Sequence, residues 1–338
     1  MFDTQNAGLS IQLEELTKRY PGQAEPAVDR VTLDIPAGQL TMLVGPSGCG
    51  KTTTMKLVNR LIEPTSGSIR IGGEDVLALD PHEMRRHIGY VVQQIGLFPH
   101  MTIAQNIGLV PKLLGWPKRR IADRVDELLH MVGLDPAAFL RRYPRQLSGG
   151  QQQRVGVARA LAADPPVMLM DEPFGATDPI TRERLQNEFL RLQRELRKTI
   201  VFVTHDFEEA LKLGDRIAVL AEHSLVVQYD SPARLLAAPA NDYVASFIGS
   251  TAALKQLSLT TVAELTVVPS PERTKSPAAI VDSSVSLRDA LDVIVKQSGE
   301  PVGVLDAAGT FVGLLSFEDI CAALAGSAPH GMEAVDVG

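Results

Sequence analysis

Short apolar runs alternate with helical patterns along the first 250 residues of the chain. Apolar and polar residues alternate over 31–35, which predicts a half-buried strand at an antiparallel edge. A helix is expected from 51 to about 61, directly after an apolar run. Strands that alternate with helices predict a parallel sheet. Three continuous apolar runs are typical of strands buried on both faces: 40–44, 167–170 and 200–203.

The pattern changes twice further along the chain. Helical spacing from about 103 to 163 predicts a helical subdomain, and Asp178 before Pro179 is typical of a helix start. We expect a first domain at 1–250, a linker at 251–277 that contains Ser, Thr and Pro, a small α+β domain at 278–326 and a tail at 327–338. The small domain is predicted as a helix, two strands and a second helix: 286–297, 302–306, 311–315 and 317–324.

Composition narrows the class of protein. Of the 338 residues, 45% are hydrophobic and 22% are charged, which is typical of a globular protein. The net charge of −7 argues against a protein that binds duplex nucleic acid through its phosphates. Two cysteines, Cys49 and Cys321, are too few for a disulfide framework and fit a reducing compartment. The sequence shows no secretion signal and no run of 18 apolar residues, so we expect neither secretion nor a membrane span.

A glycine-rich segment after the first buried strand has the pattern of a phosphate-binding loop. Glycines let backbone N–H groups converge on anionic oxygens, a lysine adds a positive charge, and a threonine hydroxyl can bind Mg²⁺. The alternative is a plain glycine-rich turn, which the strand before it and the helix after it disfavour. The candidate residues are Gly45, Pro46, Ser47, Gly48, Cys49, Gly50, Lys51, Thr52 and Thr53.

Two adjacent carboxylates, Asp171 and Glu172, follow the second apolar run. Beside a nucleotide, Asp171 would orient Mg²⁺ and Glu172 would polarise the attacking water. An acidic pair at a helix start is the alternative interpretation.

Leu147-Ser148-Gly149-Gly150-Gln151, followed by a helix, resembles the signature motif of ABC-type ATPases. It lies between the phosphate loop and the acidic strand, as in that family, and the resemblance covers about residues 10–248. The resemblance implies an α/β fold of the P-loop NTPase class, with a mixed sheet, an antiparallel edge subdomain and a helical subdomain. It also implies that ATP is sandwiched in a head-to-tail homodimer, between the phosphate loop of one subunit and Ser148, Gly149, Gly150 and Gln151 of the other.

Four further residues match the family's motifs in order. Tyr20 resembles the aromatic residue that stacks on adenine, and Gln93 resembles the glutamine that reaches the metal and the attacking water. Asp178 resembles the aspartate of the dimer-contact loop, and His205 resembles the switch histidine at the γ-phosphate. Taken alone, each has a plain structural alternative, such as a turn aromatic or a strand-end amide. Thr177 departs from the family, which commonly has leucine there.

The resemblance assigns roles to these residues. The expected cofactors are ATP and Mg²⁺. The expected catalytic residues are Glu172, His205, Lys51 and Gln93, and the expected metal ligands are Thr52, Gln93 and Asp171.

Within this family the sequence looks most like the ATP-binding subunits of osmoprotectant importers, which take up glycine betaine, proline betaine, choline or carnitine. The segments that carry this likeness are 93–100, 171–176 and 241–249. The region from about 278 to 324 resembles one CBS repeat, in which Ser316 and Asp319 either contact a nucleotide or form a capping box. From 251 onward there are 5 Lys or Arg and 11 Asp or Glu, which disfavours an anionic ligand.

The implied partners are a second copy of the chain, two membrane permease subunits and an extracytoplasmic substrate-binding protein, with no nucleic acid. The implied location is the cytoplasmic face of the cell membrane, held there by the permease subunits. The alternatives are an importer subunit for another small solute, such as an amino acid or a polyamine, and a soluble ABC ATPase without a membrane partner.

Overall fold

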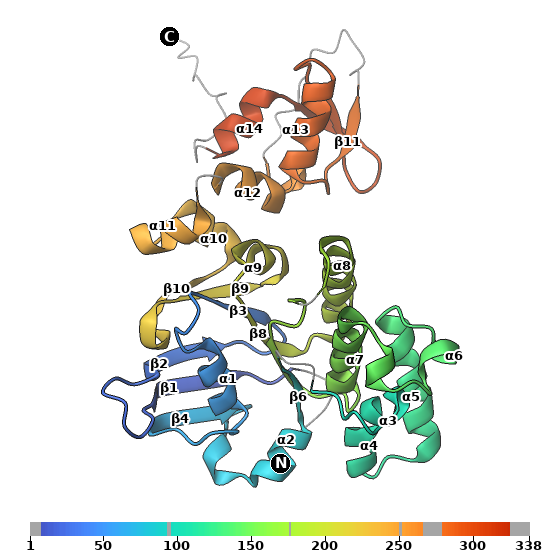
Figure 1. The fold of residues 1–338 in the computed structure, drawn as a ribbon. Coiled ribbons are helices and arrows are strands. Elements are labelled where there is room, and N and C mark those ends of the chain that lie inside the picture. Colours follow the sequence, from blue (N-terminus) through green and yellow to red (C-terminus); the bar gives the residue numbers. More distant parts are fainter. Residues whose placement is uncertain (1–7, 93–95, 176, 250–251, 266–278, 325–338) are drawn as a thin grey trace, which may run out of the picture. The chain divides into compact units, whose positions relative to one another are not determined.

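The computed structural model describes residues 8–92, 96–175, 177–249, 252–265 and 279–324. The chain divides into two compact units, Met1–Ser231 and Pro232–Gly338 (Figure 1). Within the described ranges, no helix is both long enough and apolar enough to pass through a membrane.

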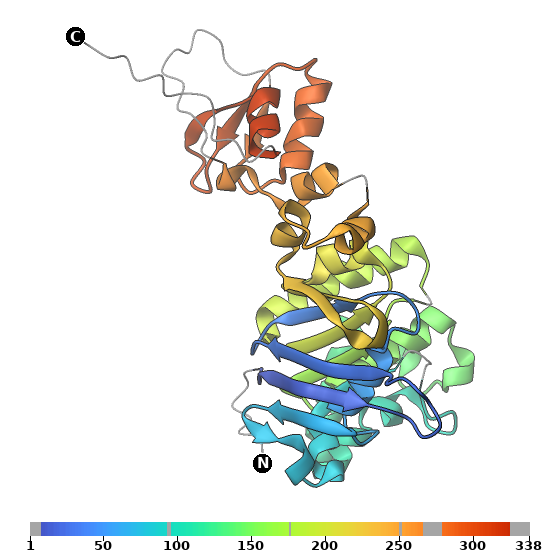
Figure 2. The same ribbon diagram turned by 90° about the vertical axis from the view of Figure 1, so that its left-hand side faces the viewer.

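An antiparallel sheet forms one edge of the first unit. Residues alternate between buried and exposed along β2, as the sequence pattern predicts for a half-buried strand. Figure 2 shows β1, β2 and β4 side by side at this edge. The strand order is β2-β1-β4-β5, with β1 Ile11–Lys18, β2 Val28–Ile35, β4 Ser66–Ile71 and β5 Glu74–Asp75.

A six-stranded sheet forms the centre of the first unit. The predicted buried runs form β3, β7 and β8, and every residue of these strands is buried. The predicted parallel sheet is confirmed, since all neighbours pair in parallel except β9 and β10. The order is β10-β9-β3-β8-β7-β6, with β10 Val226–Asp230, β9 Arg216–Leu220, β3 Leu40–Val44, β8 Thr199–Thr204, β7 Val167–Asp171 and β6 Ile88–Val91.

Helix α1, Lys51–Val58, packs between the two sheets. Its Met55 and Leu57 share one buried cluster with Ile11 of the antiparallel sheet and Leu169 of the central sheet. The helix ends earlier than predicted because Arg60 has a φ of 48°, which breaks the helical path. Burial from both sides fixes the start of α1 next to the end of β3.

The predicted helical subdomain is confirmed, and its helices gather on one side of the central sheet (Figure 1). It contains α3 Ile103–Ile107, α4 Leu109–Leu113, α5 Lys118–Met131, α6 Pro136–Phe139, η2 Pro144–Gln146 and α7 Gly149–Leu161. The remaining helices of the first unit are η1 Val76–Ala78, α2 Pro81–Arg86, α8 Pro179–Leu196, α9 Phe207–Leu213 and η3 Glu222–Ser224.

The second unit contains the predicted helix, two strands and helix, together with elements that the sequence analysis did not predict. Its sheet has the order β11-β12-β13, parallel between the first two strands and antiparallel between the last two. The elements are α10 Pro232–Ala237, α11 Asp242–Ile248, α12 Ala252–Leu259, η4 Val262–Glu264, β11 Ile280–Asp282, α13 Leu287–Lys296, β12 Val302–Leu305, β13 Phe311–Leu315 and α14 Phe317–Leu324.

The boundary between the units differs from the predicted one at residue 250. Helices α10 and α11 belong to the second unit. The described part of the expected linker 251–277 contains α12 and η4, and Leu257 and Val262 are buried in the same core as Ile294. The sequence analysis predicted a linker here because Ser and Thr residues surround these apolar residues. In the structure the apolar residues pack into a core instead. Residues 266–278 and the predicted tail 327–338 lie outside the described residues.

Candidate nucleotide site

The predicted phosphate-binding loop joins β3 to α1. A Cβ at Gly45 would collide with the carbonyl oxygen of Leu220, so only glycine fits at the base of the loop. Gly48 and Gly50 have φ angles of 83° and 108°, which let the chain turn sharply before the helix. The tip of the loop is exposed at Pro46, Ser47 and Gly48. The loop therefore presents backbone N–H groups and a helix N-terminus to solvent, an arrangement that binds phosphate.

Lys51 opens α1 with its side chain folded back into the loop. The residue is 7% exposed, and Nζ donates to the carbonyl oxygens of Gly45 at 2.7 Å and Pro46 at 2.9 Å. These bonds hold the ammonium inside the loop. The positive charge is therefore placed where an anion bound by the loop would meet it.

Thr52 connects the loop to the first predicted carboxylate. Its hydroxyl donates to Oδ1 of Asp171 at 3.3 Å, from α1 to the end of β7. Burial raises the pKa of Asp171 above its usual 3.8, while the Thr52 hydrogen bond lowers it. A hydroxyl and a carboxylate on neighbouring elements are oxygen ligands of the type that Mg²⁺ uses beside nucleotide phosphates. The residues present therefore fit the metal.

Glu172 and His205 form the second pair of the site. Nδ1 of His205 lies 3.0 Å from Oε1 of Glu172, and the imidazole is largely exposed. Glu172 has a φ of 46°, and its N–H donates to the carbonyl oxygen of Val203 at 3.0 Å. The histidine holds a carboxylate that is still accessible, which suits a base that acts on a bound water molecule.

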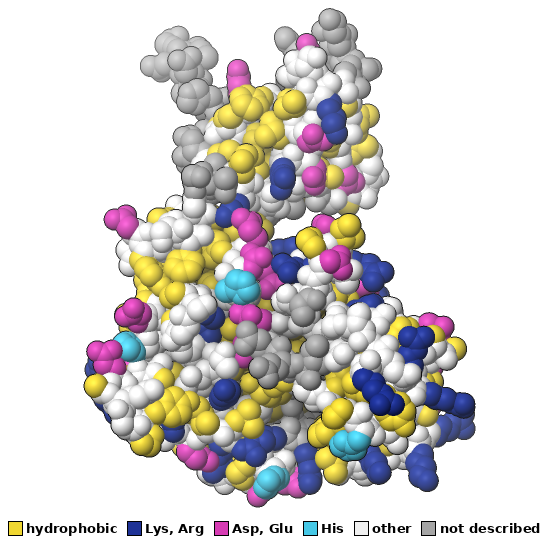
Figure 3. Space-filling model, in the orientation of Figure 1, with side chains coloured by type: hydrophobic (Ala, Val, Ile, Leu, Met, Phe, Trp, Pro, Cys, Tyr) yellow, Lys and Arg dark blue, Asp and Glu magenta, His cyan; other side chains and the backbone are white. Residues whose placement is uncertain are grey.

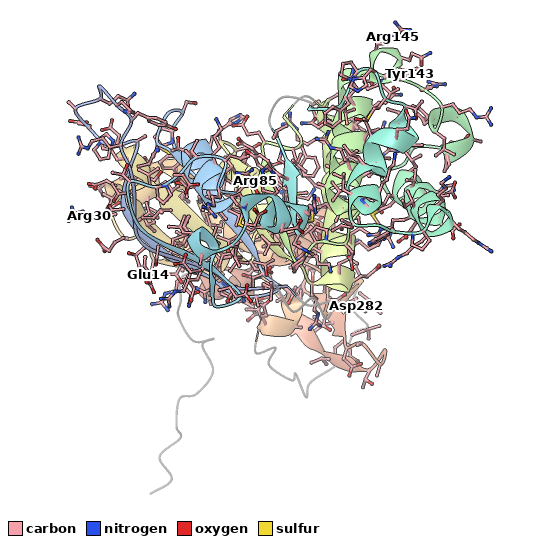
Figure 4. The ribbon with its side chains drawn as sticks, turned by 90° about the horizontal axis from the view of Figure 1, so that it is seen from below. Glu14, Arg30, Arg85, Tyr143, Arg145 and Asp282 are labelled. Carbon is pink, nitrogen blue, oxygen red and sulfur yellow. The ribbon has the colours of Figure 1, made fainter. Side chains whose placement is uncertain are left out.

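The predicted signature residues form the start of α7. The Ser148 side chain accepts from the N–H of Gln151, and the Gln151 side chain accepts from the N–H of Ser148, which is a capping box. A Cβ at Gly149 would meet nothing within 4 Å, so this helix start is open. Figure 4 shows Tyr143 and Arg145, just before this motif, projecting outward. Within the described structure, the Ser148 side chain bonds only to its own helix and not to the phosphate loop.

Contacts in the loop before α8 show how threonine is accommodated at position 177. The Thr177 hydroxyl donates to the carbonyl oxygen of Phe174 at 2.6 Å, so a buried polar group is satisfied where a leucine is common. Its methyl group faces Gly150, whose added Cβ would lie 3.4 Å from it. Asp178 caps α8 by accepting from the N–H of Thr181, and this bond lowers the pKa of Asp178.

The other three predicted residues of the site are Tyr20, Thr53 and Gln93. Tyr20 is partly exposed, and the Lys18 ammonium lies 5.4 Å from the centre of its ring. Thr53 lies in the first turn of α1 and is also partly exposed. Gln93 lies outside the described residues. The structure thus joins the phosphate loop, Asp171, Glu172 and His205 and leaves the signature residues apart from them.

Three residues around the site were missed by the sequence analysis. Burial, and the nearby charge of Asp171, raise the pKa of Tyr90 to about 12. Ser224 donates to the carbonyl oxygen of Cys49 from its N–H at 2.6 Å and from its hydroxyl at 3.1 Å. Gln153 Nε2 donates to the carbonyl oxygen of Glu172 at 3.2 Å. No local pattern identifies Ser224, while Gln153 could have been noticed as a polar residue on the buried side of a helix.

Comparison with known proteins decides the family. The ABC transporter family matches residues 28–175. The osmoprotectant import ATP-binding protein OsmV of Salmonella typhimurium is 52% identical over 300 residues, which cover 87% of this chain and 78% of that protein. The chain belongs to the ATP-binding subunits of ABC transporters.

Other members of the family agree with this assignment. The glycine betaine/carnitine/choline transport ATP-binding protein OpuCA of Bacillus subtilis is 59% identical over 239 residues, or 71% of this chain and 62% of that protein. The dimeric structure of MJ0796, a bacterial ABC transporter cassette, is 37% identical with a TM-score of 0.61, and the match covers 66% of this chain and 98% of that one. The same cassette has a second dimeric structure, bound to ADP and Pi. Membership in this family makes the chain an ATPase with the ABC cassette fold.

Proposed function

We propose that this chain hydrolyses ATP to power the import of osmoprotectants, such as glycine betaine, proline betaine, choline or carnitine, through separate membrane subunits. The observation that carries the proposal is the length of the OsmV match. It covers 87% of this chain, whereas the ATPase unit ends at Ser231, so the likeness continues into the second unit. The predicted nucleotide-site residues all belong to the first unit, so the similarity of the second unit supports a shared type of transporter as well as a shared ATPase.

The site residues have distinct roles in this proposal. Backbone N–H groups of the loop and Lys51 bind the β and γ phosphates. Bound Mg²⁺ would neutralise phosphate charge, and Thr52, Asp171 and, by resemblance, Gln93 would hold it. Glu172 accepts a proton from the attacking water, and the bond from His205 keeps its carboxylate in place. Tyr20 would stack on the adenine ring.

We further propose that two copies enclose ATP head to tail. The open start of α7 supports this arrangement, because Ser148 and Gly149 are exposed and a Cβ at Gly149 would meet nothing within 4 Å, which leaves room for a second molecule. Asp178 lies on the loop that would meet the partner copy. ATP bound by both copies favours the closed dimer, and hydrolysis releases it, which gives a cycle of motion for transport.

A groove in the helical subdomain supports contact with a membrane permease. It has a volume of about 1480 Å³, and α3, α4 and α5 contribute to its lining, with Met101, Leu109 and Ile121 providing apolar surface. Lys and Arg side chains gather over this region on the right of Figure 3. An apolar floor with a charged rim fits an amphipathic helix of the permease. This contact would hold the chain at the cytoplasmic face of the membrane, together with an extracytoplasmic binding protein on the other side.

The second unit supports a regulatory role as a single CBS-like module. Its β11-α13-β12-β13-α14 order agrees with one such repeat. Ser316 and Asp319 bond to each other at the start of α14, with Ser316 Oγ 2.7 Å from Asp319 Oδ2, so both serve the helix cap. We therefore favour dimerisation between copies over nucleotide binding as the role of this module.

Uptake of labelled glycine betaine tests the proposal. Cells that express the chain with its membrane partners should take up the label, and choline and carnitine should compete while spermidine should not. The Glu172→Gln variant should take up none. If spermidine or an amino acid blocked uptake, the transported solute would be one of these instead. ATPase activity that drives no solute uptake with any membrane partner would favour a soluble ABC ATPase.

A further inference from the structure

Gln153 is a buried residue of α7 with an amide side chain, two residues after the end of the signature motif. It is 6% exposed, and its Nε2 donates to the carbonyl oxygen of Glu172 at 3.2 Å. Its Oε1 is buried and has no hydrogen-bond partner within the described structure. Burying an amide side chain whose oxygen has no hydrogen-bond partner lowers the stability of the fold. This cost suggests that the hydrogen bond from Nε2 serves a function.

The residue that accepts this bond has an unusual backbone. Glu172 has a φ of 46°, in the left-handed region that residues other than glycine rarely adopt. Such a conformation persists when the surroundings hold it in place. Three bonds do so: the Glu172 N–H to Val203, the Gly175 N–H to the Glu172 carbonyl at 3.2 Å, and the amide of Gln153 to the same carbonyl.

The start of α7 also touches the dimer-contact loop of the same chain. Gly150 lies against the Thr177 methyl group, and Thr177 directly precedes Asp178. The first turns of α7 therefore contact both the loop that carries Asp178 and the backbone of Glu172. A shift of this helix start would change the support of both.

We propose that Gln153 is a positioning residue that couples the nucleotide held at the signature motif to Glu172 in the chain's own site. The inference rests on the head-to-tail dimer of the proposed function. In that dimer, Ser148, Gly149 and Gly150 contact the ATP bound by the partner copy. Gln153 is on the same rigid helix, so partner-bound ATP fixes the position of the amide and, through it, the orientation of the Glu172 carboxylate. Each site then hydrolyses fastest when the other is occupied.

The test is Gln153→Met, which keeps the length of the side chain and removes the donor. We expect the kcat of the ATPase to fall about tenfold, as for one lost hydrogen bond, with KM for ATP within about twofold. The Hill coefficient for ATP should fall from above 1 in the wild-type protein to about 1. ATP-dependent dimer formation in a Glu172→Gln background should be retained, because binding groups are untouched.

Gln193→Met is the matched control. Gln193 is also a buried glutamine, whose Nε2 donates to the carbonyl oxygens of Lys198 at 2.6 Å and Gly38 at 3.2 Å, outside the nucleotide site. It should lose a similar amount of thermal stability and keep both kcat and the Hill coefficient. Gln153→Glu, which lacks the donor when ionised, is the second variant and should behave like Gln153→Met.

Each result decides the question. Unchanged kcat and Hill coefficient in folded Gln153→Met overturn the proposal, as does an equal fall in the Gln193→Met control. If neither Gln153 variant folds while Gln193→Met does, Gln153 serves stability alone and the proposal is also overturned. A wild-type protein that shows neither ATPase activity nor ATP-dependent dimers would instead contradict the proposed function.

Discussion

His205 and Glu172 meet at 3.0 Å because two buried strands fix their register. Strands β7 and β8 pair in parallel with Asp171 opposite Val203, so each of the two residues follows the end of its strand at the same edge of the sheet. A slip of one residue would turn the buried side chains of either strand to the opposite face. The packing of apolar residues in the sheet thus determines the geometry of the Glu172–His205 pair.

Glu172→Gln should abolish hydrolysis and retain ATP binding. The amide has no carboxylate to accept the proton from water, while the phosphate loop is unchanged, so we expect at least about a hundredfold loss of kcat. Gel filtration with ATP should show a stable dimer. Glu188→Gln is the control, since Glu188 is an exposed residue of α8 that pairs with Arg191. A Glu172→Gln protein that stays monomeric with ATP would contradict the sandwich arrangement.

Lys51→Ala should lose nucleotide affinity. Removing a charged donor from the phosphate loop should weaken ATP binding by about tenfold to a hundredfold, as for a lost charge-assisted hydrogen bond. Titration with a fluorescent ATP analogue measures this. Lys56→Ala removes an exposed lysine from the same helix and should bind ATP nearly normally. Equal losses in the two variants would show that only the net charge of α1 matters.

Asp171→Asn should stabilise the nucleotide-free protein at neutral pH. Because burial raises the pKa of Asp171, the folded chain binds the proton more tightly than the unfolded chain, and stability is lost as the pH rises through the folded pKa. The variant removes this loss. We expect its Tm at pH 7–8 to exceed that of the wild type by about 2–4 °C, and the gap to close below about pH 4. Thermal melts without Mg²⁺ or ATP measure this.

Asp178→Asn is the control, because the pKa of Asp178 is lowered whereas that of Asp171 is raised. The Thr181 backbone bond lowers the pKa of Asp178, so its stabilising contribution is present at neutral pH and is lost as the pH falls through the folded pKa. This variant should not raise the Tm at pH 7–8. If both variants raised it equally, general surface charge, rather than burial, would account for the effect at Asp171.

Ala122→Glu should uncouple ATP hydrolysis from transport. Ala122 is an exposed residue that lines the groove of the helical subdomain, and a buried glutamate there would oppose docking of an apolar helix. Uptake in cells should fall at least about tenfold, while the isolated subunit keeps its ATPase activity. Leu113→Glu is the matched control, because Leu113 is exposed on α4 outside the groove lining. Equal uptake in the two variants would argue against this groove as the contact.

The sequence predicted the parts of the site whose residues are contiguous. The phosphate loop, the Asp171-Glu172 pair and the signature motif each depend on a short run whose spacing has a physical cause. The buried strands were equally clear, because a run such as 167–170 has no polar residue to suggest an exposed face. The Asp178 cap was predicted for the same reason, since capping is a local effect.

Contacts between distant segments could not be predicted in this way. Gln153 and Glu172 meet through packing of α7 against the sheet, and Ser224 reaches Cys49 from 175 positions away in the chain. Helix α12 and the turn η4 of the second unit were also missed, because Leu257 and Val262 find their apolar partners beyond residue 280. Tertiary packing, rather than local pattern, decides each of these cases.

The two hydrogen bonds that Ser224 donates to the Cys49 carbonyl oxygen have a consequence for ATP affinity. The phosphate loop is tied to η3 by two donors, and the hydroxyls of Thr54 and Ser224 lie 3.2 Å apart beneath it. The conformational entropy of ordering the loop is therefore lost during folding, before any nucleotide arrives. ATP meets a preorganised cradle, so more of the interaction energy of its phosphates remains to favour the closed state.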